Sequence, residues 1–252
     1  MSKDLSILLT TCHKLERHLD AFVSLFDLFW EDHPPITVVS DVGRFDYKNK
    51  FIGKEKEFAP LLLEALAALS KNSLNRYCYL VLEDLAPIWK IDCDRLKNVS
   101  KIAINNDLAK VNFSIQKPTE FGSDELEIEG QKFYTIKRTE TFHWPNSLQP
   151  ALWRVDFLKE TCERAMEKHR NPWQFEHLDL TEPVYASSLQ WPTVFHGLSY
   201  MNKINRNSLP FLRKGAHPLL YRYFRNQYFR SELIYQYNRI SRIGDKMLKK
   251  IK

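Results

Sequence analysis

Short apolar segments that end in carboxylates alternate with amphipathic segments over the first hundred residues, and this alternation constrains the fold more than any other feature. The apolar segments are LSILLT (5–10), ITVVS (36–40) and YCYLVL (77–82). Asp41 follows the second, and Glu83 and Asp84 follow the third. Apolar runs of this length are typical of strands buried on both faces.

The segments between these strands have helical periodicity. Apolar side chains recur at spacings of three and four over residues 14–30, and residues 58–69 form a second such segment with Pro60 in its first turn. Residues 92–98 indicate a short helix and 102–105 another strand. The order strand–helix–strand–helix–strand predicts an α/β domain with a mostly parallel sheet flanked by helices.

The remainder of the chain is less regular. We expect short strands at 111–116, 126–129 and 132–137, the last two joined by a turn at Gly130-Gln131. Residues 155–169 predict a helix and residues 191–198 a further strand. The sequence shows neither an internal repeat nor a linker inside residues 1–218, which we take as one domain, with 219–252 as a separate tail.

Composition excludes several classes of protein. Only 7 of 252 residues are glycine, and neither GxGxxG nor GxxxxGK[ST] occurs, which argues against dinucleotide-binding and P-loop proteins. No apolar run approaches the ~20 residues that span a bilayer, and the N-terminus resembles a strand more than a signal peptide, so we expect a cytoplasmic protein. The four cysteines lack metal-binding spacing and are expected to be reduced thiols: Cys12, Cys78, Cys93 and Cys162.

The positive charge is concentrated in the tail. Residues 219–252 hold nine basic and two acidic side chains, whereas the whole chain has a net charge of only +6. The tail also carries aromatic residues, and its apolar positions approximate one helical face. Such a helix could lie on an anionic membrane, bind nucleic acid through phosphates, or pack on the body with its charges in water. We expect contact with a membrane surface and no nucleic-acid partner.

Two adjacent carboxylates at the end of an apolar strand, Glu83 and Asp84, are the sharpest local feature. Desolvating carboxylates costs free energy, so we expect them at this position only where a ligand or a structural interaction compensates the cost. One such ligand is a divalent cation chelated by a diphosphate, and another is the hydroxyl group of a sugar or ribose. The structural alternative is that Asp84 caps the helix that follows. Since ligands of parallel sheets bind beyond the carboxyl ends of the strands, we expect these acids to share one edge with Thr10, Thr11 and Asp41.

A second polar region surrounds the predicted helix 155–169. SLQPALWR (147–154) precedes this helix and NPWQFE (171–176) follows it, so that Trp153 and Trp173 flank it. Exposed tryptophans suit the apolar faces of sugars, and Glu176 could accept a proton from a hydroxyl. The alternative is that both tryptophans belong to the core and that Glu176 is a surface acid.

Taken together, the segments TTCHKLERHLDAF, ITVVSD, YCYLVLEDLAPIWKID, SLQPALWRVDFL and NPWQFE resemble bacterial GT-A-type glycosyltransferases of surface polysaccharide (capsule or O-antigen) synthesis. The resemblance covers roughly the first 180 residues, and the order and spacing of the segments carry it. It implies a GT-A-like, Rossmann-like domain with a nucleotide-sugar donor over the carboxyl edge of the sheet and a glycan acceptor, carried on a lipid at the inner face of the membrane.

The resemblance also implies roles for individual residues. Asp84 matches the last position of the family's DxD motif and would hold Mn²⁺ or Mg²⁺. Leu82 stands in place of the first aspartate, so the alternative is an enzyme with weak metal binding or none. Glu176 matches the acid that serves as general base in inverting members. The expected donor site comprises Thr10, Thr11, Cys12, Lys14, Arg17, Asp41, Glu83 and Asp84. The expected acceptor site comprises Gln149, Trp153 and Trp173.

Other functions remain open on the sequence. A nucleotidyltransferase would also place acids at strand ends, but usually with more glycine near the phosphates. A catalytically inactive module that binds a nucleotide, or nucleic acid through the tail, is a further alternative.

Overall fold

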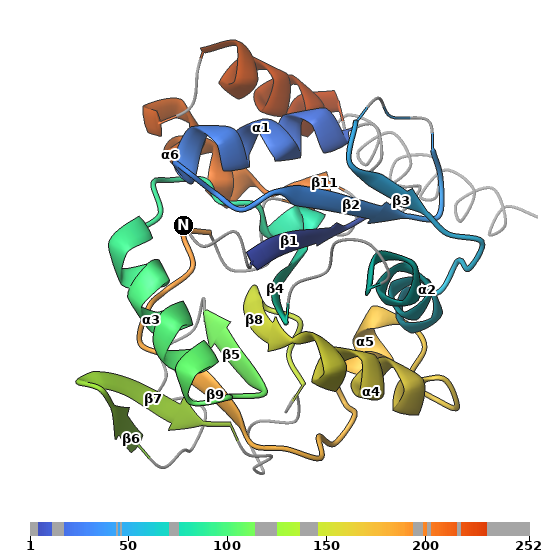
Figure 1. Ribbon diagram of the computed structural model, residues 1–252. Helices are drawn as coiled ribbons and strands as arrows, with labels where there is room; N and C mark the ends of the chain where they lie inside the picture. Colours follow the sequence, from blue (N-terminus) through green and yellow to red (C-terminus); the bar gives the residue numbers. More distant parts are fainter. Residues whose placement is uncertain are drawn as a thin grey trace, which may run out of the picture.

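The computed structural model describes residues 5–11, 18–43, 45, 47–70, 76–113, 125–136, 146–193, 199–200, 203–215 and 218–230. These residues form a nine-stranded sheet with helices on both faces (Figure 1). The strands of the sheet are β1 (Leu5–Thr10), β2 (Ile36–Ser40), β3 (Lys50–Ile52), β4 (Tyr77–Leu82), β5 (Lys110–Phe113), β6 (Glu125–Ile128), β7 (Gln131–Thr135), β8 (Ala151–Arg154) and β9 (Val184–Ser187). The helices are α1 (Leu19–Phe29), α2 (Phe58–Ser70), α3 (Cys93–Asn105), α4 (Val155–Ala165), α5 (Pro172–Phe175) and α6 (Leu209–Gly215).

The strand order is β3-β2-β1-β4-β8-β5-β9-β7-β6. The first four strands are mutually parallel, β8 runs antiparallel to both its neighbours, and β5 and β9 are parallel again. Only β8 and β7 therefore oppose the common strand direction, since β6 is antiparallel to β7. The expected α/β, GT-A-like (Rossmann-like) architecture with a mostly parallel sheet is confirmed.

Alternation along each strand divides the core into two layers. Ile7, Tyr79 and Leu152 pack with α1 and α3 on one face. Leu8, Leu80 and Ala151 pack with α2, α4 and α5 on the opposite face. The parallel strands are buried on both faces, as their uninterrupted apolar sequences indicate.

The strand predicted at 102–105 is wrong, because these residues form the last turn of α3. Leu96, Val99 and Ile102 share one buried helical face, and Asp92 caps the helix by accepting a hydrogen bond from the Arg95 amide. The next strand, β5, begins later, at Lys110. Of the strand predicted at 191–198, residues 191–193 are not extended and the others lie outside the described residues.

The predicted hairpin is present as β6 and β7. Glu129 and Gly130 connect them, both with positive φ (50° and 75°), so the turn lies one residue earlier than expected. This backbone conformation is the one that favours glycine in a two-residue hairpin turn.

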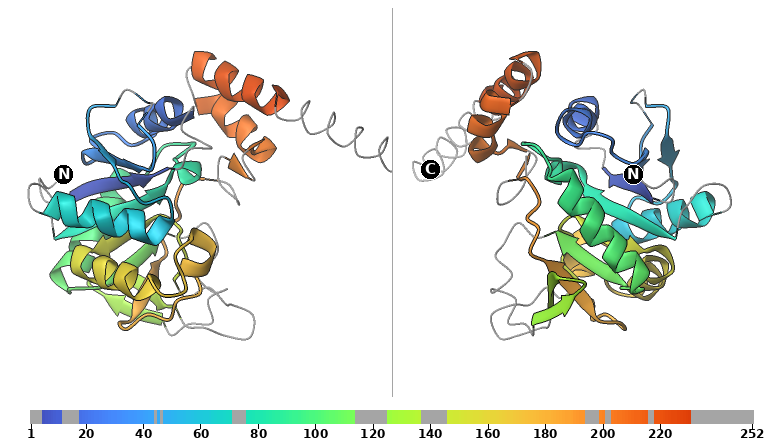
Figure 2. Two further views of the ribbon diagram at one scale, coloured as in Figure 1. Left: turned by 90° about the vertical axis from the view of Figure 1, so that its right-hand side faces the viewer. Right: turned by 60° about the vertical axis from the view of Figure 1, so that its left-hand side comes forward.

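The last described segments are helical and lie at one end of the molecule. After the small hairpin of β10 (Ser199–Tyr200) and β11 (Lys203–Ile204), α6 and a helix over residues 218–230 stand together beyond α1 in both views of Figure 2. Phe224 is fully buried and belongs to the same core layer as α1. Among the described residues, no helix is long and apolar enough to cross a membrane.

Candidate functional site

The strand order makes the carboxyl ends of β1 and β4 a candidate ligand site. The chain leaves β1 toward β2 on one side and returns to β4 on the other side, so the strand order reverses between these neighbours. Open α/β sheets bind ligands at such a switch point. Thr10 ends β1 opposite Leu82 at the end of β4, which brings the first and third predicted strand ends together.

The hydroxyl groups at the end of β1 are buried and available for hydrogen bonding. Thr10 and Thr11 are about 95% buried, and neither Oγ1 has a hydrogen-bond partner within the described residues. A buried polar group without a partner costs free energy, which a bound ligand or an ordered water would recover. The other expected donor residues of this loop, Cys12, Lys14 and Arg17, lie outside the described residues.

The acid pair after β4 is in a short 3₁₀ turn, Glu83–Leu85 (η2). Glu83 is buried, and burial followed by the charge of Asp84 raises the pKa of Glu83 well above its ordinary range. Asp84 is partly exposed, but its Oδ1 is buried and no described residue hydrogen-bonds it. Burial, supplemented by the charge of Glu176 and opposed by backbone hydrogen bonding, raises the pKa of Asp84 to about 7.

Asp41, the acid after β2, is half-buried in the bend that follows the strand. The adjacent turn is closed by a hydrogen bond from the Val42 amide to Ser40 Oγ (3.2 Å). Asp41 therefore sits at the same edge as Thr10, because β2 and β1 are neighbouring parallel strands.

Glu176 lies directly after α5, a single helical turn that the sequence specifies locally. Asn171 caps this turn by accepting a hydrogen bond from the Gln174 amide, and Pro172 occupies its first position. The Leu148 amide donates a hydrogen bond of 2.7 Å to Glu176 Oε1. Burial raises the pKa of Glu176, whereas this hydrogen bond and the charges of Lys110 and His177 lower it.

The charge of Glu176 is the smallest of the causes that shift the pKa of Asp84, and the charge of Asp84 is not among the causes of the shift at Glu176, so the electrostatic interaction between the two carboxyl groups is weak. They are 92 positions apart in the sequence: Asp84 lies in the turn after β4, and Glu176 follows α5. Partly buried carboxyl groups with raised pKa values are enriched in functional sites.

A fully buried lysine, which the sequence analysis did not single out, supports this arrangement. Lys110 Nζ donates hydrogen bonds to Asn146 Oδ1 (3.0 Å) and to the Ser147 carbonyl (2.8 Å), and it lies 4.1 Å from the centre of the Trp153 ring. Asn146 Nδ2 in turn donates to the Phe175 carbonyl (3.0 Å). Lys110 thus connects the segment that holds Glu176 Oε1 to the turn that carries Glu176.

Asn112 is a second missed residue. It is 1% exposed, and neither its Oδ1 nor its Nδ2 has a hydrogen-bond partner within the described residues. Its side chain is on the same sheet face as Lys110, two positions nearer to the carboxyl end of β5. Its only sequence signal is the alternation in KVNF, which is typical of a strand with one solvated face.

The two tryptophans expected in the acceptor site differ in their surroundings. Trp153 is 1% exposed, and its ring contacts Lys110 and stacks on Phe157, so the expectation that it binds a sugar is corrected to a core role. Trp173 is 74% exposed on α5, three residues before Glu176. Gln149, also expected there, is half-buried beside Leu148.

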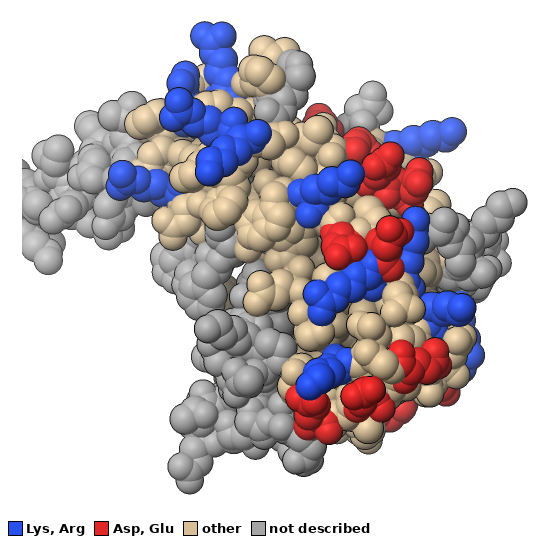
Figure 3. Space-filling model, turned by 90° about the vertical axis from the view of Figure 1, so that its left-hand side faces the viewer, with Lys and Arg blue, Asp and Glu red and all other residues tan. Residues whose placement is uncertain are grey.

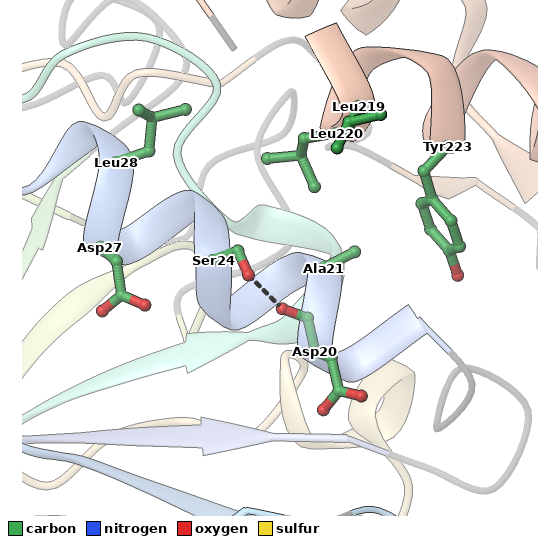
Figure 4. Close-up of a pocket in the computed structure, with 8 residues that line it drawn as sticks. All are labelled: Asp20, Ala21, Ser24, Asp27, Leu28, Leu219, Leu220 and Tyr223. Atoms are coloured by element: carbon green, nitrogen blue, oxygen red, sulfur yellow. Dashed lines mark hydrogen bonds between the residues drawn. The ribbon is translucent and has the colours of Figure 1, made fainter. Parts of the chain in front are cut away.

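Two surface hollows lie away from these acids. A groove of about 690 Å³ separates α1 from helix 218–230, with Asp20 and Asp27 on the α1 wall and Leu219, Leu220 and Tyr223 on the other (Figure 4). A second hollow of about 560 Å³ surrounds the start of α3.

No protein family model matches the chain, and no curated protein matches it. Solved structures that are similar include the bifunctional IspDF from Campylobacter jejuni, with a TM-score of 0.43 and 13% identity, covering 85% of this chain and 55% of that one. UDP-glucose pyrophosphorylase complexed with UDP-glucose has a TM-score of 0.43 and 9% identity, covering 74% of this chain and 90% of that one. Mannose-1-phosphate geranyltransferase from Thermus thermophilus has a TM-score of 0.42 and 11% identity, covering 76% of this chain and 75% of that one.

At these TM-scores and identities, the similarities assign neither a family nor an activity to this chain. None of the three names is that of a surface-polysaccharide glycosyltransferase. Glycosyl transfer therefore remains a proposal, which depends on the site itself.

Proposed function

We propose that the chain is a glycosyltransferase that moves a sugar from a nucleotide-sugar donor to a glycan acceptor with inversion at the anomeric carbon. The observation that carries this proposal is the pair of Asp84, whose buried Oδ1 beside the switch point of the sheet has no hydrogen-bond partner among the described residues, and Glu176, whose Oε1 is held by the Leu148 amide. The pair provides one acid for the donor diphosphate and one for the acceptor hydroxyl.

Glu176 would be the general base. The Leu148 amide fixes Oε1, so Oε2 would accept the proton as the acceptor oxygen attacks the anomeric carbon. Its raised pKa favours this role, because a base is most effective when its pKa approaches the working pH. Lys110 holds the supporting segment and is a positioning residue in this scheme.

Asp84 would face the diphosphate of the donor, with Thr10, Thr11, Asp41 and Glu83 around it. Within the described residues, no group of three or more His, Cys, Asp or Glu side chains could hold a metal ion. The buried, unpartnered Oδ1 of Asp84 still fits Mg²⁺ or Mn²⁺, because these ions can be bound by one or two carboxylates together with substrate phosphates. Such an ion would neutralise the departing diphosphate.

The acceptor would approach from the side of Trp173 and Gln149. Trp173 offers an exposed ring near Glu176, which suits stacking on a sugar face. We further propose that the acceptor is carried on a lipid in surface polysaccharide synthesis, and that the protein acts from the cytoplasm at the inner face of the cell membrane.

Product analysis tests the proposed reaction. The chain would be incubated with UDP-glucose, UDP-N-acetylglucosamine and GDP-mannose, with and without Mn²⁺, after a thermal-shift screen selects the stabilising donor. Glycosyl transfer releases a nucleoside diphosphate and bonds the sugar to the acceptor oxygen. Slow hydrolysis without an acceptor releases the nucleoside diphosphate and the free sugar. Formation of pyrophosphate from a nucleoside triphosphate and a sugar phosphate would instead identify a nucleotidyltransferase. If neither a nucleoside diphosphate nor pyrophosphate is formed and no donor stabilises the protein, both the glycosyltransferase and the nucleotidyltransferase hypotheses are contradicted.

A further inference from the structure

One part of the chain lacks acidic residues altogether. Between Glu182 and Glu232 the sequence contains neither aspartate nor glutamate. The same stretch holds seven basic residues, namely Lys203, Arg206, Arg213, Lys214, Arg222, Arg225 and Arg230. Figure 3 shows Lys and Arg side chains on the projecting end of the molecule without an acidic side chain among them, whereas both signs mix on the body below. Residues 183–231, which include α6 and helix 218–230, therefore carry basic side chains but no acidic ones.

The orientation of helix 218–230 is fixed by its contacts with α1. Phe224 is fully buried and stacks on Phe22, with ring centres 6.0 Å apart. Tyr223 Oη and His18 Nδ1 are 2.6 Å apart and share a hydrogen bond at the start of α1. Because these contacts hold the inner face, the outer face of the helix points to solvent.

That outer face combines basic and large apolar side chains. Leu219, Arg222, Arg225 and Phe229 are all exposed and recur at helical spacing, with Leu219 69% and Phe229 55% exposed. Large apolar side chains with this degree of exposure, alternating with arginines, are typical of helices that lie in a membrane interface.

Helix α6 extends this surface. Phe211 is 42% exposed and packs against Trp89, which is itself partly exposed, with ring centres 4.8 Å apart. Arg213 and Lys214 follow it and are exposed. Tryptophan and phenylalanine beside basic residues are the side chains enriched where proteins meet lipid headgroups.

We propose that these residues form a docking surface for an anionic lipid bilayer. The surface consists of Trp89, Phe211, Arg213, Lys214, Leu219, Arg222, Arg225, Phe229 and Arg230. Its basic side chains would meet the negatively charged headgroups, and its four large apolar side chains would enter the boundary of the acyl chains.

The groove of Figure 4 limits this surface on one side. Its α1 wall carries Asp20 and Asp27, which an anionic membrane would repel, whereas Leu219, at the edge of the outer face, also lines the opposite wall. The bilayer would therefore face α6 and helix 218–230 rather than α1. A nucleic acid would be attracted by the same arginines, but it gains nothing from Leu219, which the bilayer would desolvate.

The docking requires no catalysis. Its use, bringing the site to a lipid-linked acceptor, rests on the proposed glycosyltransferase function. Vesicle binding measured without a donor therefore fails or succeeds independently of the reaction.

Co-sedimentation of the full chain with vesicles tests the docking. One set of vesicles is pure phosphatidylcholine and the other contains one quarter phosphatidylglycerol, both at 0.1 M salt. We expect binding to the anionic vesicles only. The variant Arg222→Glu/Arg225→Glu should bind at least 10-fold more weakly, because each basic residue near such a surface contributes roughly a 5-fold gain in affinity. Leu219→Gln/Phe229→Gln should also weaken binding.

The matched control is Lys159→Glu/Lys168→Glu, which makes the same change in net charge at exposed positions on and just after α4, and should bind within 2-fold of the wild type. Circular dichroism would verify that all variants are folded. Equal binding by Arg222→Glu/Arg225→Glu and the wild type would overturn the proposal, and would assign any binding to another part of the chain. Tighter binding to a 30-base-pair DNA duplex than to the vesicles would overturn it as well.

Discussion

The parallel half of the sheet consists of β3-β2-β1-β4, and Asp84 follows the last of these strands. Its Oδ1 is buried without a hydrogen bond from any described residue. The mixed half, β8-β5-β9, supports Glu176, whose Oε1 is held by the Leu148 amide and whose surroundings are fixed by Lys110. Burial raises the pKa of both carboxyl groups. Backbone hydrogen bonding opposes the shift at Asp84, and the hydrogen bond from the Leu148 amide opposes it at Glu176. The two ends differ in that Asp84 keeps one buried oxygen without a hydrogen bond from any described residue, whereas Oε1 of Glu176 is hydrogen-bonded.

The largest expected effect concerns the side of Glu176. Glu176→Gln keeps an oxygen for the Leu148 amide but cannot accept a proton, so turnover of the donor that the thermal-shift screen selects should fall about 10²–10⁴-fold. Donor affinity, measured by calorimetry, should stay within 2-fold. Unchanged turnover would remove Glu176 from the role of base.

The two tryptophans separate the core of this half from its surface. Trp153→Ala should destabilise the protein by about 3–5 kcal/mol in urea unfolding, since it empties a buried site beneath Lys110. Trp173→Ala should change stability by less than about 0.5 kcal/mol, because the side chain is exposed. A raised KM for the acceptor in Trp173→Ala, with kcat retained, would support stacking, and an unchanged KM would contradict it.

Lys110→Met tests the polar support of Glu176. It leaves Asn146 Oδ1 and the Ser147 carbonyl without their donor, so we expect a loss of about 2–4 kcal/mol in unfolding free energy. Lys159→Met, at an exposed position of α4, is the control and should change stability by less than about 0.5 kcal/mol. If Lys110 also positions Glu176, the pH profile of kcat should shift in Lys110→Met, whereas a purely structural role would leave the profile in place.

At the end of β4, in contrast, we expect a substitution to raise the stability. The pKa of Asp84 in the folded chain, about 7, lies above the ordinary 3.8, so the folded state binds this proton more tightly than the unfolded state. The stabilising contribution of protonated Asp84 is therefore fully present below about pH 4 and is lost as the pH rises through 7. Asp84→Asn should unfold like the wild type at pH 4 and be more stable at pH 8. The shift corresponds to at most about 4 kcal/mol, and because the side chain is partly exposed we expect on the order of 2 kcal/mol. Lower stability of this variant at pH 8 would show that the ionised carboxylate has an internal partner.

The smallest effect is expected at Asn112. Its amide makes no hydrogen bond within the described residues, so Asn112→Val should leave stability within about 1 kcal/mol or raise it. A donor or acceptor that hydrogen-bonds Asn112 should bind this variant more weakly, which calorimetry with the same donor would measure. A large loss of stability would show that the amide is paired inside the protein.

The parallel half was predictable from the sequence because each strand is a short, continuous apolar run. β1, β2 and β4 occupy the expected residues, and their ends bring Thr10 and Asp84 to one edge. The mixed half was not predictable in the same way. β8 is short, and its sequence ALWR suggested exposed stacking rather than a central strand.

The polar residues of β5 were missed for a related reason. Lys110 and Asn112 alternate with Val111 and Phe113, a pattern typical of a strand with one face in water. In the structure α4 and α5 and the segment around Ser147 cover that face. Only tertiary contacts between segments far apart in the chain reveal this coverage.

The position of β8 also determines when the sheet can be completed during synthesis. β8 pairs with both β4 and β5, yet it is the last of the three to leave the ribosome. At the ~5–20 residues per second of translation, the 72 residues from Leu82 to Arg154 take about 4–15 s. During that interval the edge of β4, and after synthesis of Phe113 also the edge of β5, lacks β8, which makes the nascent chain a candidate client for chaperones that shield unpaired strands.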